Sequence, residues 1–297
     1  MRIDVLTLFP EVLQPHVTAS IIGRAQNAGI AEICLHQLRD YSTDPHRKVD
    51  DRPFGGGPGM VLMCQPVYDA VEAIEALDPR PALRVLLTPQ GRTFNQAAAQ
   101  RLATCERLLL ICGHYEGFDE RILDLLQPLE MSLGDFVMTG GEIAAAAVID
   151  AVVRLLPGAL GHEEAALHES FQQGRLDHPQ YTRPREFRGR AVPEVLVGGN
   201  HAEIATWRRE QAEQRTRERR PDLLALGAAD RPAGTSARST RRNPDSQLVS
   251  NRVIERAAVL PALVHAPDDR PSAHAACRLA VCTGAAAGSH AESEALR

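Results

Sequence analysis

LGDFVMTGGE, residues 133–142, joins an apolar run to an alanine-rich segment, Ile143 to Leu156, that we expect to form a helix. The stretch holds three glycines ahead of that helix, and the acid Asp135 lies between the first glycine and the other two. Glycine has no Cβ and adopts positive φ at little cost, so a glycine turn between a strand and a helix lets the backbone approach a ligand closely. Such a turn typically holds a cofactor through main-chain N–H and C=O groups. By itself, the stretch is equally consistent with a tight turn that binds nothing.

Two further glycine loops accompany this turn. CGHYEGFDER, residues 112–121, follows directly on the apolar run Leu108 to Ile111. DDRPFGGGPGM, residues 50–60, ends at another apolar run, Val61 to Met63. The turn at residues 133–142 therefore does not stand alone, which favours a ligand site.

Short apolar runs alternate with helical patterns from residue 1 to about residue 158. The expected strands are Arg2–Leu8, Ala31–His36, Leu83–Thr88, Arg107–Cys112 and Leu129–Leu133, and the expected helices are Thr18–Ala28, Pro66–Leu77, Asn95–Thr104 and Phe118–Leu126. This alternation predicts an α/β fold with a parallel sheet covered on both faces. Ligands bind such sheets beyond the carboxyl ends of the strands, where two of the glycine loops lie. Pro89 is expected to end a third such strand.

A dinucleotide-binding Rossmann fold is the main alternative for this pattern. It needs a Gly-x-Gly-x-x-Gly turn after the first strand. Here Phe9-Pro10-Glu11 follows the first strand, and the glycine loops come later. Phosphate binding by a P-loop is excluded as well, because Lys48 is the only lysine and is not part of a Gly-Lys-Ser/Thr motif.

The composition suits a globular enzyme better than a protein that coats nucleic acid. The 297 residues carry a net charge of −5, and 44% of them are hydrophobic. The six scattered cysteines lack zinc-site spacing, and no targeting or membrane-spanning segment is recognisable, which predicts a cytoplasmic protein with reduced thiols and no membrane partner. An enzyme that contacts RNA only locally needs basic patches and not a basic total.

The three glycine loops resemble those of the bacterial tRNA (guanine-N1)-methyltransferases. IDVLTLFP, residues 3–10, and YTRP, residues 181–184, resemble the same family, and the resemblance is collinear from Met1 to about Leu224. It implies methylation of the guanosine immediately 3′ of the anticodon of tRNA, with S-adenosylmethionine (AdoMet) as the methyl donor. It also implies a SPOUT fold whose C-terminal trefoil knot forms the AdoMet pocket, a homodimer, and activity supported by Mg²⁺. Nothing in the periodicity of the sequence indicates a knot.

The resemblance assigns residues to the cofactor site. Several of them would act through main-chain atoms, and the side chains at positions 133, 136 and 138 would shape an apolar slot for adenine. The expected AdoMet contacts are Pro89, Gly113, Tyr115, Leu133, Gly134, Asp135, Phe136, Val137, Met138, Gly140 and Gly141.

Methylation at guanine N1 requires removal of the N1 proton and stabilisation of negative charge on O6. A carboxylate base and a nearby arginine suit these two tasks. By resemblance the base is Glu169, at a position where the family usually has aspartate, and Asp177 is the alternative base. The charge-stabilising arginine is Arg154. Without the resemblance, we would interpret Arg154 as a cation that offsets a helix dipole.

The expected substrate residues come from several parts of the chain. Asp50, Gly57 and Gly59 belong to the loop that would hold a flipped-out guanine. Glu116 would either act in this site or order its own loop. Arg183, together with arginines farther along the chain, is expected to contact tRNA phosphates.

Four segments are expected: an AdoMet-binding SPOUT domain at 1–160, an interdomain linker at 161–174, a helical tRNA-binding domain at 175–227 and a disordered tail at 228–297. A helix from Asn200 to Pro221 would carry many of the arginines, although interleaved glutamates would also suit a self-paired, solvated face. Two other functions stay open: a methyltransferase of this fold that acts on ribosomal RNA, and a catalytically silent RNA-binding protein. The loop at 50–60 and the YTRP motif favour the tRNA enzyme.

Overall fold

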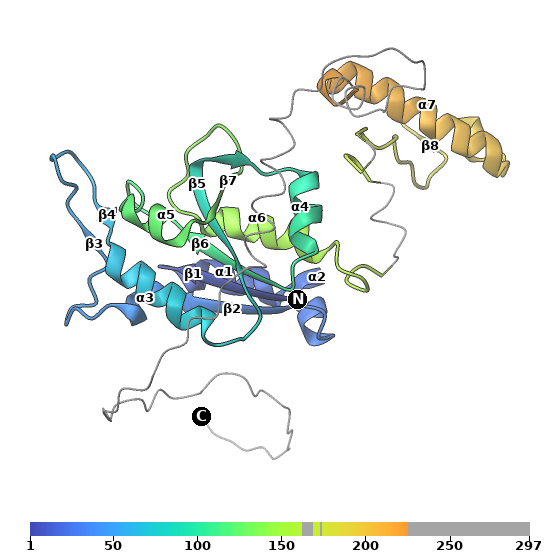
Figure 1. Ribbon diagram of the computed structural model, residues 1–297. Coiled ribbons are helices and arrows are strands. Elements are labelled where there is room, and N and C mark those ends of the chain that lie inside the picture. The colour runs from blue at the N-terminus through green and yellow to red at the C-terminus, as the bar shows by residue number, and fades with distance from the viewer. Residues whose placement is uncertain (162–168, 173, 225–297) are drawn as a thin grey trace, which may run out of the picture. The chain divides into compact units, whose positions relative to one another are not determined.

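The structure is a computed structural model that describes residues 1–161, 169–172 and 174–224. Residues 1–161 contain a five-stranded parallel sheet with the strand order β2-β1-β6-β5-β7 (Figure 1). The strands are β1 (Arg2–Thr7), β2 (Glu32–Gln37), β5 (Leu83–Thr93), β6 (Arg107–Cys112) and β7 (Leu129–Ser132). The predicted parallel α/β fold is confirmed, and each of the five predicted strands is present.

β5 differs from its prediction, because Pro89 does not end it. The ladder to β7 shifts register after Leu87 and resumes at Arg92, which pairs with Met131. Pro89 lies in the shifted stretch, where the ladder does not require the N–H group that proline lacks. Gly91 lies so close to β7 that a Cβ there would overlap the main chain of Met131.

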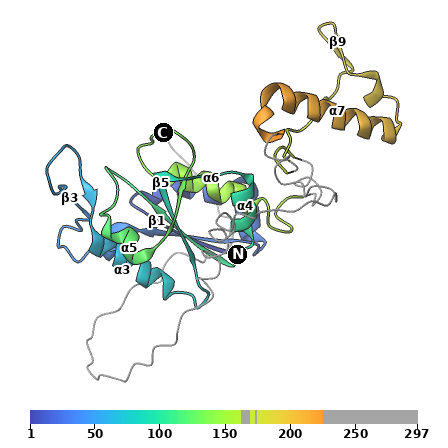
Figure 2. The same cartoon turned by 45° about the horizontal axis from the view of Figure 1, so that its top comes forward.

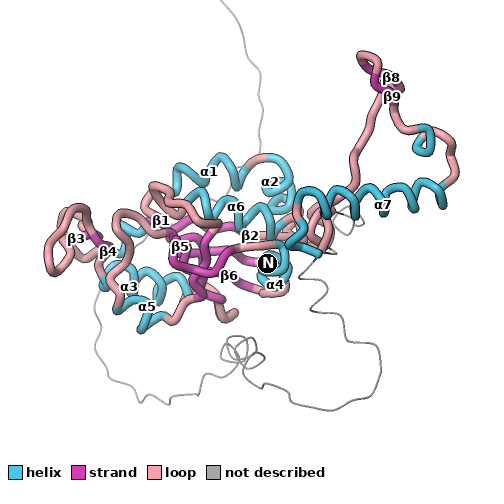
Figure 3. Tube along the Cα trace, turned by 90° about the horizontal axis from the view of Figure 1, so that it is seen from above, coloured by secondary structure: helices cyan, strands magenta, loops and turns pink. Residues whose placement is uncertain are grey.

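Helices cover both faces of the sheet, and Figure 3 shows α1, α2 and α6 on one side of the strands and α3 and α5 on the other. The helices are α1 (Pro10–Thr18), α2 (Ser20–Asn27), α3 (Cys64–Glu75), α4 (Gln96–Ala103), α5 (Arg121–Leu126) and α6 (Glu142–Val153), with the short 3-10 helix η1 (Leu38–Tyr41). The sequence pattern does not predict α1, because Pro10 and Pro15 suggest a loop. Pro10 occupies the first turn, where the missing N–H costs nothing.

Alternate residues of the central strands face opposite layers, as the geometry of a strand requires. In β6, Leu108 and Leu110 pack in the layer of α1, α2, α4 and α6, while Leu109 and Ile111 pack in the layer of α3 and α5. All six residues of β6 are buried. Because helices cover both faces, this strand is apolar almost throughout, which made it recognisable in the sequence.

Two short antiparallel pairs lie outside the central sheet. β3 (Asp50–Asp51) pairs with β4 (Val61–Leu62) at the base of the first glycine loop. β8 (Glu186–Phe187) pairs with β9 (Arg190–Ala191) and forms a hairpin.

One long helix lies among residues 174–224, as predicted. The 3-10 helix η3 (Glu194–Leu196) precedes α7 (His201–Arg219), which Figure 2 shows with the β9 hairpin. The side chain of Asn200 caps α7 by accepting a hydrogen bond from the Ala202 N–H over 3.1 Å.

The segment boundaries predicted at residues 160 and 174 stay predictions. Residues 162–168 and 173 of the predicted linker, and the whole predicted tail at 228–297, lie outside the described residues. Within the part of the chain that the structure describes, none of the helices has the length and apolar character needed to cross a membrane.

Candidate active site

The glycine loops after β6 and β7 lie against each other at the carboxyl ends of their strands. His114 and Gly140 form a β-bridge, and the Gly141 N–H donates to the Gly113 carbonyl over 2.9 Å. A Cβ at Gly141 would lie 2.8 Å from the Cα of Cys112, and a Cβ at Gly140 would overlap the imidazole of His114. Glycines 140 and 141 are therefore needed to pack one loop on the other, and not only to let a ligand approach.

The loop after β7 presents apolar side chains to solvent. Phe136 is 55% exposed and Val137 is 84% exposed, while Leu133 and Met138 are half-buried. Apolar groups beside a glycine-rich main chain suit a flat, uncharged ring such as adenine. The adenine slot predicted at positions 133, 136 and 138 stays a prediction.

The other predicted cofactor residues border the same loops. Tyr115 directly follows His114, has a φ of 59° and is 45% exposed. Pro89 lies in the shifted part of β5, which is next to both β6 and β7 in the sheet. Asp135 is exposed and Gly134 is half-buried. The predicted cofactor residues thus lie in β5 and in the loops that follow β6 and β7. These three strands are adjacent, so the residues lie near the carboxyl ends of neighbouring strands.

The glycine loop at 50–60 meets the turn after β6. The Glu116 N–H donates to the Met60 carbonyl over 3.0 Å. The Glu116 side chain lies where a Cβ of Gly59 would be, and Gly59 also has a φ of +84°, so glycine is required there for two reasons. Glu116 therefore contacts the loop at 50–60 through its main chain and its side chain, and both of its predicted roles stay predictions.

Asp50 and Gly57, two other predicted substrate residues, have different surroundings in this loop. Asp50 is half-buried and pairs with Leu62 in the β3–β4 ladder. Gly57 is exposed, has a φ of +119°, and would place a Cβ in open space. The glycine at 57 thus serves the backbone conformation of the loop and leaves room beside it.

Two of the predicted catalytic residues are in contact. Arg154 is the C-cap residue of α6, and its Nη2 donates to Glu169 Oε1 over 2.5 Å. This hydrogen bond raises the pKa of Arg154, which stays cationic. The side chains of Arg154 and Glu169 are 26% and 37% exposed, so a substrate could reach the pair from solvent. The predicted position of Arg154 at a helix C-terminus is also correct, so its charge offsets the helix dipole as well.

Asp177, the alternative base, is engaged elsewhere. Its Oδ1 accepts a hydrogen bond from the His178 N–H over 2.7 Å, and its Oδ2 accepts one from the Gln180 side chain over 3.0 Å. Its own N–H donates to Ser170 Oγ. The Asp177 carboxylate thus closes a local turn, a common structural use of aspartate. Glu169 is the better placed of the two predicted bases.

A buried polar cluster that the sequence pattern does not reveal lies between the two loops. Thr7 Oγ1 donates to Glu142 Oε1 over 2.6 Å, and His114 Nε2 lies 2.9 Å from Glu142 Oε2. Burial and the charge of Glu142 raise the pKa of the neighbouring Cys112 thiol. The sequence offered one indication of this cluster: His114 and Glu142 each lie within a glycine motif. Nothing in the sequence pattern connects either of them with Thr7.

The predicted tRNA contact Arg183 lies in an exposed stretch, residues 180–191, that also contains three further arginines: Arg185, Arg188 and Arg190. The Arg188 guanidinium lies 5.3 Å from the centre of the Phe187 ring, which is 63% exposed. On α7, in contrast, Arg217 pairs with Glu213 over 3.2 Å. The self-paired face is thus present on at least part of α7.

Comparison with known proteins decides the family. Residues 1–226 match the family model of the tRNA (guanine-1)-methyltransferase TrmD. The chain belongs to the TrmD family. A tRNA (guanine-N(1)-)-methyltransferase of Rhodopirellula baltica is 54% identical over 239 residues, which cover 80% of this chain and 99% of that protein. Proteins of the same name from Moorella thermoacetica and Geobacter sulfurreducens are 55% and 53% identical, over 76% and 78% of this chain and 90% and 95% of their own lengths.

The TrmD match confirms the predicted family and contains every predicted site residue. It ends at residue 226, close to the predicted end at about Leu224. Within residues 1–161, 169–172 and 174–224, no group of three His, Cys, Asp or Glu side chains is arranged to hold a metal ion. The Mg²⁺ implied by the resemblance has no assigned ligands.

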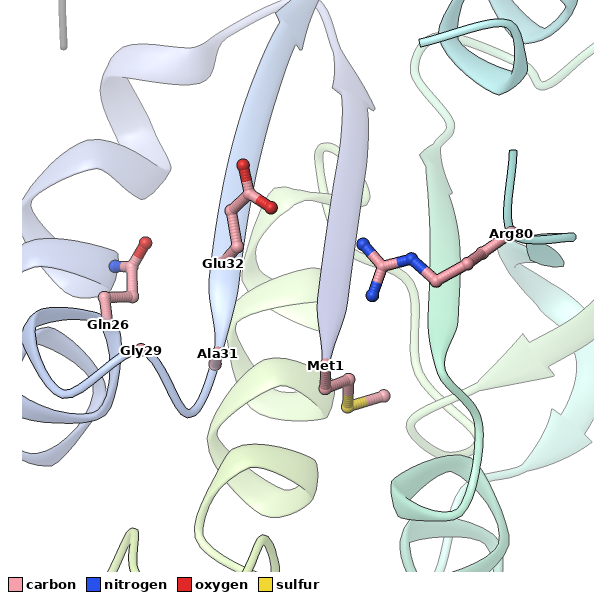
Figure 4. Close-up of a pocket in the computed structure, with 6 residues that line it drawn as sticks. All are labelled: Met1, Gln26, Gly29, Ala31, Glu32 and Arg80. Atoms are coloured by element: carbon pink, nitrogen blue, oxygen red, sulfur yellow. The ribbon is translucent and has the colours of Figure 1, made fainter. Parts of the chain in front are cut away.

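A cavity of about 410 Å³ lies at the other edge of the sheet from the TrmD glycine loops. It opens at the amino ends of β1 and β2, and its lining residues are Met1, Gln26, Gly29, Ala31, Glu32 and Arg80 (Figure 4). None of these is a predicted site residue. The cavity is therefore not the predicted cofactor pocket.

Proposed function

We propose that this chain is a cytoplasmic, AdoMet-dependent enzyme that methylates N1 of guanosine 37 in tRNA. Membership of the TrmD family supports the reaction class. At the level of residues, the contact between Arg154 and Glu169 carries the proposal, because a cation lies beside a carboxylate and both side chains are partly exposed to solvent.

This pair matches the edge of guanine. Guanine presents an acceptor, O6, next to a donor, the N1–H group. Arg154 offers donors and Glu169 offers an acceptor, so the pair can hydrogen-bond to both guanine groups at once. Adenine presents the reverse order, an amino donor next to an unprotonated N1. Adenine would place its amino donor against the donors of Arg154 and its unprotonated N1 against the carboxylate of Glu169, so a site with this polarity would disfavour adenine.

The chemistry follows from the same two side chains. Glu169 accepts the proton from guanine N1 and holds it on its carboxyl group, from which it passes to solvent. Arg154 stabilises the negative charge that moves onto O6 as the proton leaves. Bound AdoMet would supply an electrophilic methyl group, so no covalent enzyme intermediate is required. Glu169 is one methylene longer than the usual aspartate of the family, and it contacts Arg154 in this structure.

The proposed AdoMet site uses the loops at the carboxyl ends of β5, β6 and β7. Main-chain groups of the glycine turns would bind the polar parts of AdoMet, and the side chains at 133, 136 and 138 would flank adenine. The trefoil knot remains part of this proposal. It is compatible with the pairing of β7 with both parts of β5 and with the packing of the following loop on the turn after β6.

The guanine would enter between this site and the loop at 50–60. Asp50, Gly57 and Gly59 would line its path, and Glu116 would fix the loop beside it. Arg183 and the exposed arginines after it would contact tRNA phosphates, which position the RNA without reading its sequence. Asp177 stays a candidate base only if Glu169 proves dispensable.

A homodimer is the proposed assembly, with the AdoMet domain of one subunit and the tRNA-binding domain of the other completing each site. On α6, Ile143, Ala147, Asp150 and Arg154 follow one another at helical spacing along one stripe. Ile143 is 58% exposed, Ala147 and Arg154 are half-buried, and Asp150 is exposed. A second copy that covered Ile143 would therefore also approach Arg154.

The test uses two tRNA transcripts that differ only in the base 3′ of the anticodon, guanosine or adenosine. Methyl transfer from labelled AdoMet is measured for the wild type, Glu169→Gln, Arg154→Ala and the control Asp177→Asn, and AdoMet affinity is measured separately. We expect label on the guanosine transcript alone. Glu169→Gln and Arg154→Ala should each lose about 100-fold or more in turnover with nearly unchanged AdoMet affinity.

Each other outcome points to a different conclusion. Loss of activity in Asp177→Asn but not in Glu169→Gln would move the base to Asp177. Label on ribosomal RNA and on neither transcript would indicate the ribosomal RNA methyltransferase. Binding of tRNA without transfer of label to any RNA would indicate the silent RNA-binding protein.

A further inference from the structure

A buried carboxylate lies where the loop after β6 meets the loop after β7. Glu142, the first residue of α6, is only 4% exposed. One of its oxygens accepts the hydrogen bond from the fully buried Thr7 at the end of β1, and the other lies 2.9 Å from His114 Nε2. A buried carboxylate without partners would be strongly unfavourable, so the contacts with Thr7 and His114 are what allow Glu142 to occupy this position.

These contacts join three segments that the sequence keeps far apart. Thr7 is 135 positions from Glu142, and His114 is 28 positions from it. Beside them, the Gly141 N–H donates to the Gly113 carbonyl, and Gly140 has no room for a side chain because His114 and Glu142 fill that space. The side-chain contacts therefore reinforce the main-chain contact between the loop after β6 and the loop after β7.

The same cluster reaches the residues that would face the cofactor. The His114 ring lies 4.9 Å from the Phe9 ring and 5.9 Å from the Tyr115 ring, measured between centroids. The Phe9 N–H donates to Thr7 Oγ1, which fixes the hydroxyl that faces Glu142. A shift of the His114 imidazole would thus displace Tyr115 and Gly140, two of the predicted AdoMet contacts.

On the basis of the proposed AdoMet site, we propose that Thr7, Glu142 and His114 are positioning residues, which hold the two glycine loops in the conformation that binds the cofactor. They act through the loops and do not touch the reacting atoms. The position of Glu142 at the start of α6 favours its negative charge, because the helix dipole is positive there.

The decisive comparison is Thr7→Val against Thr7→Ser in the full-length protein. Valine has nearly the shape of threonine and leaves one Glu142 oxygen without its hydroxyl partner, whereas serine keeps the hydroxyl. A second variant, Glu142→Gln, retains an oxygen for Thr7 and presents an amide N–H to His114, whose Nε2 accepts it in the tautomer protonated at Nδ1. AdoMet affinity by calorimetry, hydrogen exchange of the two loops in the free protein, and the melting temperature are measured for each protein. Methyl transfer then gives KM and kcat.

We expect Thr7→Val to weaken AdoMet binding about tenfold, since a hydrogen bond to a buried charged group is lost. Its KM for AdoMet should rise in parallel, with kcat at saturating AdoMet nearly unchanged. Amides in residues 113–117 and 134–141 should exchange faster than in the wild type, while those of β1 and β6 keep their protection. Thr7→Ser and Glu142→Gln should retain most of the wild-type affinity.

The proposal is overturned if Thr7→Val binds AdoMet as tightly as the wild type. It is also overturned if exchange accelerates equally throughout the sheet, because the cluster would then stabilise the whole fold and not the loops. Failure of the wild type itself to bind AdoMet would contradict the proposed function instead. In that case the exchange of the two loops in Thr7→Val still decides whether the cluster holds them.

Discussion

Asp4 and Arg107 carry opposite charges in the interior of the sheet, and neither side chain is exposed to solvent. Arg107 Nε donates to Asp4 Oδ2 over 2.9 Å, and His36 Nε2 lies 2.9 Å from Asp4 Oδ1. Burial by itself would raise the pKa of Asp4, but the hydrogen bonds from His36, Arg2 and Arg107 outweigh it and lower this pKa to about 2. At the scale of single residues, the charge of Asp4 is thus stabilised by partners from several strands.

The low pKa of Asp4 predicts a specific dependence of stability on pH. Because the pKa is lower in the folded protein than the ordinary 3.8, the contribution of the ionised Asp4 is complete above about pH 4 and is lost as the pH falls through about 2. The difference in free energy of unfolding between the wild type and Asp4→Asn should therefore shrink by about 2 kcal/mol over this range. Urea unfolding at a series of pH values measures it.

Asp135→Asn is the control for Asp4→Asn, because it makes the same change of charge at an exposed position. A difference between the wild type and Asp4→Asn that stays constant down to pH 2 would contradict the lowered pKa of Asp4.

At the scale of elements, the β8–β9 hairpin and α7 both carry arginines, but the surroundings of these arginines differ between the two elements. Arg188 lies in the turn of the hairpin, Arg190 begins β9, and both are exposed. On α7, Glu213 lies one turn before Arg217 and pairs with it, so the charge of Arg217 is partly compensated. The arginine content of a segment therefore does not by itself show where RNA phosphates would bind, and the hairpin is the better candidate.

We expect Arg190→Gln to weaken binding of tRNA and to lower the slope of log K against log salt concentration by about one unit, as loss of one phosphate contact requires. Arg217→Gln is the matched control and should change the slope much less, because Glu213 already compensates Arg217. Fluorescence anisotropy over a range of salt concentrations measures both. Equal changes in the two variants would assign the phosphate contacts to α7 as much as to the hairpin.

At the scale of the whole molecule, several exposed apolar side chains lie on or beside the face of the sheet that α1 and α6 cover. Val12 of α1 and Ile143 of α6 are 47% and 58% exposed, and their two helices lie in the same layer on one face of the sheet. Phe136 and Val137, in the loop just before α6, add further exposed apolar surface. An exposed apolar group of this kind suits a protein interface, and this face is the one we assign to the proposed homodimer.

If the proposed homodimer uses this face, Ile143→Asp is expected to convert it into a monomer and to reduce methyl transfer, because a charge would be buried in the interface without a partner. Leu125→Asp is the control, since Leu125 is 61% exposed on α5 in the opposite layer. Light scattering gives the molar mass of each variant. A wild type that is monomeric, or an Ile143→Asp variant that stays dimeric, would reject this interface.

Much of the fold could be predicted because it depends on local patterns. β6 was predicted with its observed ends, since a strand covered on both faces is a continuous apolar run bounded by polar residues. α1 could not be recognised, because prolines inside a short helix mimic a loop. Glu169 and Arg154 were predicted from the resemblance, but periodicity could not have shown that they touch, since many residues of the chain separate them.

The sequence by itself determined the parallel sheet, the family and the positions of the three glycine loops, because apolar runs and glycines act over a few neighbouring residues. Only the tertiary structure decided that β5 resumes after Pro89 and that Thr7 shares a buried hydrogen bond with Glu142, 135 positions away. It also decided that Gly140 and Gly141 are needed for one loop to pack on another. These features arise where distant segments meet, and the path of the chain, which no local pattern specifies, determines which groups come within hydrogen-bonding distance.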